Sequence, residues 1–223
     1  MKRAKRFGLP VLLVAGAASL VSADPVGNPG EFQFSFPWNW DSALLWSNGG
    51  GLLLAAPNPA ADPFILLELD SFGDVIHTGS SFPYGETRIN VGTSGNVTAT
   101  LLWINTTGAV DMDVPELVLT ATLRVHFGGP NLGGGCNTGT FQVTVDSGDY
   151  GNTVCPTGGY DFLTGEFCLQ SPANVTIPAL LGTACMNHGG DINSEFGLGS
   201  SGAALQLING TALDSTTGDP LDR

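Results

Sequence analysis

The chain has 223 residues, and its 20 Asp and Glu residues outnumber its 7 Lys and Arg residues, which gives a formal net charge of −13 at pH 7. An acidic surface repels nucleic acid, anionic membranes and acidic polysaccharides, so we expect none of these as partners. With 32 glycines and only 12% charged residues, the composition favours one β-rich domain that buries a single core.

Residues 1–23 predict a cleaved export signal. Four basic residues open the chain, an apolar run of 11 residues ends at Val21, and small residues precede the expected cleavage after Ala23. The run is shorter than the roughly 20 residues that a membrane-spanning helix needs. We expect bacterial-type export to a secreted, extracellular or cell-surface location. The chain from Asp24 onward has no lysine, and its three arginines against twenty acidic residues give a formal charge of −17.

The stretch EFQFSFPWNWD, residues 31–41, alternates aromatic and polar residues, which indicates a strand. We expect Phe32, Phe34 and Phe36 to face the core. Pro37 weakens strand pairing and puts the following tryptophans near a loop rim, where indole faces beside amide and carboxylate groups suit stacking on sugar rings. The predicted ligand-binding residues are Trp38, Asn39, Trp40, Asp41 and Trp46.

More strands follow along the chain. Residues 64–79 predict a hairpin, in which Asp70 opens the turn and Gly73 supplies the positive φ that closes it. Alternation of apolar and polar residues then predicts further strands, clear in the first three and less regular in the last, within 96–106, 115–127, 140–146 and 203–213.

These strands predict an all-β fold: a single antiparallel β-sandwich of jelly-roll or immunoglobulin-like type, or a partly closed barrel, over residues 24–213. Long loops rich in Gly, Asn and Asp join the strands, and no segment shows a convincing helical period. Residues 214–223 lack apolar periodicity and are expected to form a flexible tail.

The chain has four cysteines, which fit two disulfides in an oxidising compartment and lack the CxxC spacing of a zinc site. Three pairings are open. We favour a nested arrangement, Cys136 with Cys185 and Cys155 with Cys168, because the midpoints of these two pairs fall at nearly the same position in the sequence. Sequential pairing along the chain is the main rival.

Two sets of residues are candidates for metal binding or catalysis. One set, on a glycine-rich stretch, suits a metal-dependent hydrolase and consists of His188, Asp191, Asn193 and Glu195. The other offers oxygen ligands for calcium and consists of Asp146, Asp149 and Asn152. Asp and Asn are also the commonest turn residues, and the chain has no GxSxG motif. We therefore expect no enzyme and no required cofactor, with calcium as the alternative.

Four N-x-S/T sequons give too small an excess over chance to predict a glycoprotein: Asn96, Asn105, Asn174 and Asn209.

The sequence thus predicts an exported, non-enzymatic β-sandwich that serves as an extracellular binding module or as part of a surface structure. Its expected partner is a glycan or a protein surface. Three alternatives stay open: a carbohydrate-binding module that uses the tryptophans, a hydrolase centred on His188, and a subunit that self-assembles into a surface layer or filament. The last follows from a surface that is rich in Thr and Asn and poor in charge, which does little to prevent edge pairing.

Overall fold

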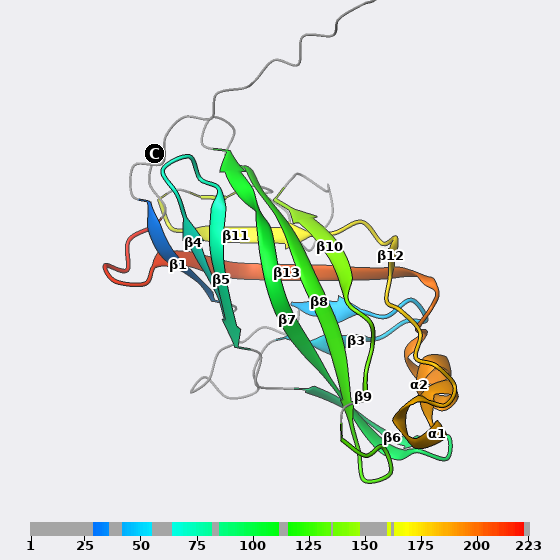
Figure 1. The fold of residues 1–223 in the computed structure, drawn as a ribbon. Coiled ribbons are helices and arrows are strands. Elements are labelled where there is room, and N and C mark those ends of the chain that lie inside the picture. Colours follow the sequence, from blue (N-terminus) through cyan, green and yellow to red (C-terminus); the bar gives the residue numbers. More distant parts are fainter. Residues whose placement is uncertain are drawn as a thin grey trace, which may run out of the picture.

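The structure is a computed structural model, and it describes residues 29–35, 42–54, 64–81, 85–111, 116–134, 136–147, 160–161 and 163–220. The chain is mostly β-strand (58%) with few helices, and its antiparallel sheet is curled into a half-barrel (Figure 1). The prediction of an antiparallel, β-rich fold is confirmed. The two flat layers of a sandwich are not seen, because one continuous sheet bends around the core instead.

The described residues form thirteen strands. Their bounds are β1 Gly30–Ser35, β2 Ala43–Leu45, β3 Gly51–Leu53, β4 Phe64–Leu69, β5 Val75–Ser81, β6 Gly85–Val91, β7 Gly95–Asp111, β8 Glu116–Gly128, β9 Cys136–Asn137, β10 Phe141–Asp146, β11 Glu166–Gln170, β12 Val175–Thr176 and β13 Ser201–Asp214. The sheet runs in the order β5-β4-β1-β13-β11-β10-β8-β7-β6, with β2 and β12 also paired to β13, β3 to β2 and β9 to β8. In Figure 1, β13 crosses behind β7 and β8. The buried apolar side chains form one core cluster to which strands from both ends of the sheet contribute.

The long hairpin of β7 and β8 confirms the predicted alternation. Every second side chain of β8 is buried: Leu117, Leu119, Ala121, Leu123, Val125 and Phe127. In β7 the register shifts between Trp103 and Asn105, so that Ile104 and Asn105 are both exposed. This bulge brings buried Thr106 to Trp103, whose Nε1 donates a hydrogen bond to the Thr106 hydroxyl at 2.7 Å. The indole N–H thereby has a hydrogen-bond partner inside the core.

Strand β1 carries the first part of the aromatic row. Phe32 and Phe34 are buried, as predicted, and the Phe34 ring packs against Phe167 with centroids 5.4 Å apart. The remaining six residues of the stretch lie outside the described residues: Phe36, Pro37, Trp38, Asn39, Trp40 and Asp41.

The hairpin of β4 and β5 has the predicted turn. Gly73 adopts a φ of 81°, and its N–H donates to the Asp70 carbonyl at 3.1 Å. Oδ1 of Asp70 accepts hydrogen bonds from the backbone N–H of Phe72 at 2.8 Å and of Asp74 at 3.0 Å. The carboxylate therefore replaces main-chain partners that the tight turn leaves without bonds.

Strand β5 is an end of the sheet, but it lies beside β7. An isolated antiparallel bridge joins Asp74 to Ala109, and Val110 N–H donates to the Gly73 carbonyl at 3.1 Å. Farther along, the Ser80 hydroxyl donates to the Trp103 carbonyl at 3.2 Å. These contacts bring the two sides of the curl together.

Two short helices contradict the expectation of a chain without helices: α1 Ala184–Asn187 and α2 Gly189–Phe196. In α2 the buried residues are Gly189, Ile192 and Phe196, which is helical spacing with only two large apolar side chains. Eight residues that include Gly, Asp, Asn and Ser are too few and too poor in helix formers for the period to stand out. No helix among the described residues is long and apolar enough to span a bilayer.

The part of the expected tail that the structure describes forms a turn. Asp214 Oδ1 accepts from the backbone N–H of Thr216 at 2.8 Å and of Thr217 at 2.7 Å. These two bonds, that of Thr217 first, lower the pKa of Asp214 from its usual value of 3.8. The Ser215 N–H donates to the Glu31 carbonyl at 2.8 Å, so the turn is attached to β1.

Candidate functional site

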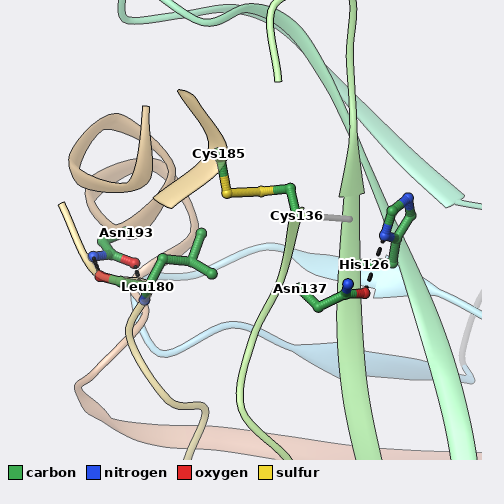
Figure 2. The surroundings of a disulfide bond; sticks show 6 residues. All are labelled: His126, Cys136, Asn137, Leu180, Cys185 and Asn193. Carbon is green, nitrogen blue, oxygen red and sulfur yellow. Dashed lines mark hydrogen bonds between the residues drawn. A yellow bond between two sulfur atoms is a disulfide. The ribbon is translucent and has the colours of Figure 1, made fainter. Parts of the chain in front are cut away.

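Two long segments without charge meet at one end of the molecule. Residues 125–145 and 167–190 contain no Asp, Glu, Lys or Arg, although the whole chain has 27 such residues. A disulfide joins them, Cys136 to Cys185, with the Cα atoms 5.0 Å apart and a separation of 49 in sequence (Figure 2). We call the surface around this disulfide, formed by residues 129–134 and 179–188, the uncharged end.

The disulfide confirms one half of the nested prediction and excludes sequential pairing. Cys168 also belongs to a disulfide. Its predicted partner, Cys155, lies outside the described residues, so the second pair stays a prediction.

The strand side of the disulfide is held firmly. Cys136 is buried in β9 and pairs with Phe127 of β8. Next to it, Asn137 Oδ1 lies 3.1 Å from His126 Nδ1 (Figure 2). Thr138 then donates its N–H to the Val125 carbonyl at 2.9 Å and accepts the Val125 N–H on its hydroxyl at 3.1 Å. Three successive residues thus fix β9 to the outermost part of β8.

On the helical side of the disulfide, one side-chain amide makes the two backbone hydrogen bonds that a neighbouring strand would otherwise make. Asn193 of α2 donates its Nδ2–H to the Leu180 carbonyl at 2.8 Å, and its Oδ1 accepts the Leu180 N–H, also at 2.8 Å (Figure 2). Both polar groups of a buried backbone position are therefore satisfied by one amide. Asn193 has a structural role here, not that of a metal ligand.

Between these supports, the chain makes a left-handed turn. Cys185, Met186 and Asn187 have φ values of 54°, 56° and 71°, although none of them is glycine. Left-handed geometry costs L-residues about 1–2 kcal/mol each, so three in succession are costly. At Gly189 an added Cβ would overlap the Leu181 carbonyl, so only glycine fits where the turn meets α2.

The turn and the segment just before it present apolar side chains to solvent. Leu181 is 76% exposed and Met186 is 67% exposed. Gly133 lies beside Met186 Sδ, and at Gly134 and Gly182 an added Cβ would meet no neighbour. The uncharged end is therefore a pair of projecting apolar side chains beside open glycine backbone.

An ion-pair cluster attaches α2 to β6. Arg88 pairs with Glu86 at 2.8 Å and with Glu195 at 3.2 Å, and its guanidinium lies 4.5 Å from the centroid of the Phe196 ring. Trp46 Nε1 donates to Glu86 Oε2 at 2.8 Å. Trp46 is only 2% exposed and packs edge-on against Phe196, so its predicted position at a loop rim is wrong.

A second polar cluster attaches α2 to the turn between β6 and β7. Asp191 Oδ2 accepts the Thr93 N–H and the Thr93 hydroxyl, both at 2.8 Å. The hydroxyl proton is then used, so His188 Nδ1, 3.2 Å away, is the donor to the Thr93 oxygen. The Thr93 backbone bond first, then its hydroxyl, lowers the pKa of Asp191 from its usual 3.8. An added Cβ at Gly92 would overlap this carboxylate.

The predicted metal set around His188 does not converge. Asp191 contacts Thr93, Asn193 contacts Leu180, and Glu195 contacts Arg88. No group of three or more His, Cys, Asp and Glu residues that could hold a metal occurs in the part of the chain that is described. Of the proposed calcium ligands, Asp146 ends β10, while Asp149 and Asn152 lie outside the described residues.

Sequence reasoning missed Leu181 and Met186. The signal was present as a long run without charge in an acidic chain, within which PALLGTACMNHGG holds apolar residues that fit no strand. Of the sequons, Asn96, Asn105 and Asn174 are exposed in the structure.

Comparisons with protein-family models, with curated proteins and with solved structures found no match.

Proposed function

We propose that this protein is an exported, non-enzymatic binding or surface module that contacts its partner through the uncharged end. One observation carries the proposal: Met186, 67% exposed, projects from a disulfide-linked left-handed turn, and Leu181, 76% exposed, projects from the segment just before it. Backbone strain of this kind persists only where the surroundings enforce it, and it gathers at functional sites. Neighbouring exposed apolar side chains can mark an interaction surface, and a rigid support lowers the conformational entropy that binding costs.

The distribution of charge supports the same surface. Burying an ionised group without a partner is costly, whereas burying apolar area contributes about 25 cal/mol per Å². A partner can bury apolar area on the uncharged end without dehydrating an acidic side chain. The two acidic residues at its border, Asp191 and Glu195, already bond to Thr93 and Arg88.

A role without catalysis is supported by how the polar side chains are used. His188, Asp191 and Thr93 resemble a catalytic set in composition only. The Thr93 hydroxyl donates its hydrogen bond to Asp191 and cannot also donate to His188, so His188 is not placed as a base for this hydroxyl and the three residues support the turn.

The test is to present purified protein to a glycan array, to insoluble neutral polysaccharides and to immobilised protein surfaces. Leu181→Glu and Met186→Glu place a charge on the uncharged end. Gln142→Glu is the matched control, because it adds the same charge at an exposed position on the outer side of β10. We expect binding by the wild type and the control, and its loss in both end variants.

Two results would contradict the proposal. If Trp40→Ala abolishes binding while Leu181→Glu retains it, the tryptophan-based carbohydrate-binding alternative replaces it. If the protein contains stoichiometric metal, and His188→Ala removes both the metal and a hydrolytic activity, the protein is an enzyme.

A further inference from the structure

We propose that the partner at the uncharged end is a second copy of this chain, so that two molecules meet end to end about a two-fold axis. This inference rests on the proposed function, since it names the partner of the same surface. In a two-fold contact each copy uses the same patch, so the patch must be complementary to itself.

Charge selects the partner. The chain from Asp24 onward has a formal charge of −17, and acidic residues lie exposed on other sides, among them Glu68, Asp74, Asp161 and Glu166. Charges within about 8 Å still interact at physiological ionic strength, so two copies that meet through these sides repel each other. A basic partner would favour those same acidic sides. The uncharged end suits a partner that is itself acidic elsewhere, and a second copy meets this condition.

The shape of the uncharged end is complementary to itself. Leu181 and Met186 project, whereas Gly134 and Gly182 leave open backbone beside them. Under a two-fold rotation, the Leu181 side chain of each copy can lie over the glycine backbone of the other. The contact then buries four large apolar side chains and no ionised group from the residues that define the uncharged end.

The support under these side chains favours association. The disulfide, the Asn193 amide and the paired residues of β9 fix both segments before binding. Little conformational entropy is then left to lose when the copies meet. The left-handed turn, although costly, then has a role in binding, because it holds Met186 in the exposed position.

The experiment is sedimentation of the purified secreted protein from micromolar to millimolar concentration, at low and at high salt. We expect a monomer–dimer equilibrium that shifts toward dimer as salt rises, because salt screens the repulsion between acidic molecules. Leu181→Glu and Met186→Glu should each weaken dimerisation by at least about tenfold. Gln142→Glu should leave it unchanged, and circular dichroism confirms that each variant is folded.

Each outcome decides between the two proposals. A monomer over the whole range, or a dimer that Leu181→Glu does not weaken, overturns the second copy as partner. If such a monomer still binds a surface in the panel through Leu181, the proposed function stands and only the choice of partner fails. If the variants alter neither sedimentation nor binding, both proposals fail. Association that weakens with salt indicates contact through opposite charges and also rejects the end-to-end dimer.

Discussion

The hairpin of β7 and β8 and the uncharged end are held together in different ways. In β8 six apolar side chains from Leu117 to Phe127 are buried in one row, and all of them belong to one continuous core. At the uncharged end, α1 and α2 bury few apolar side chains. They are held instead by a disulfide, by the amide of Asn193 and by ion pairs around Arg88. The first region depends on a repeated pattern, and the second on particular bonds.

This difference sets what mutations can do. Loss of one apolar side chain in the sheet leaves a cavity whose cost depends on how far the neighbours relax. Loss of one polar partner at the uncharged end leaves a buried donor or acceptor without a bond, or releases a segment altogether. The predictions below separate these two kinds of damage.

Phe127→Ala should have the largest effect, because Phe127 belongs to both regions. Its ring is fully buried in β8 and lies 5.0 Å from the Phe196 ring of α2, centroid to centroid. We expect a loss of about 3–5 kcal/mol in the free energy of unfolding, as for other buried aromatic residues. Urea denaturation measures it. Phe72→Ala is the control: that ring is 60% exposed, and its loss should change stability by less than about 0.5 kcal/mol.

Replacing Cys136 and Cys185 together by alanine removes the covalent link between the regions. Loop-closure entropy for 49 residues predicts about 4 kcal/mol, and measured effects usually fall between about 2 and 4 kcal/mol. We expect proteolysis in the native state to begin near α1, while the β7–β8 hairpin stays protected. Equal protection of both parts in the double variant would show that the polar bonds suffice without the disulfide.

Asn193→Ala tests the amide that replaces a strand partner. Both the N–H and the carbonyl of Leu180 lose their partner, so we expect a loss of about 1–3 kcal/mol. Asn174→Ala, at an exposed position, should have almost no effect. If the two variants unfold at the same urea concentration, water replaces the Asn193 amide and the comparison of the two regions is weakened.

The pH dependence of Asp191 should be the smallest effect, because the carboxylate is partly exposed and screened. Its pKa in the folded state is lower than the usual 3.8. The ionised form therefore stabilises the fold above pH 3.8, and this contribution disappears as the pH falls through the folded-state pKa. Asp191→Asn should lower the urea midpoint at neutral pH, and the difference from wild type should shrink in acid. A difference that is constant with pH would show that charge plays no part.

The regions also differ in how far the sequence predicts them. Alternation in β7, β8 and β10 identifies buried residues because a strand has a side-chain period of two, and Asp70 with Gly73 identifies a turn by its chemistry. One half of the cysteine pairing was found from spacing alone.

The predictions that failed concern residues whose positions depend on tertiary contacts. Trp46 looked like a binding residue because its partners, Glu86 and Phe196, lie far away in the sequence. His188, Asp191, Asn193 and Glu195 stand close together in the chain, yet helix geometry turns them toward three different neighbours. The partly closed barrel was predicted only as an alternative to the sandwich, since no local pattern records which strand lies beside β5.

The contacts between β5 and β7 have a kinetic consequence. Ser80 follows Asp74 by six residues, and Trp103 precedes Ala109 by six, so both contacts obey the same antiparallel register. Backbone amides of β5 that face β7 should exchange with deuterium faster than those of β8, which has ladder partners on both sides. Slow exchange there would mean that the two strands zip into a full ladder in solution. The correct register is already set, so such closure needs no sliding of one strand along the other.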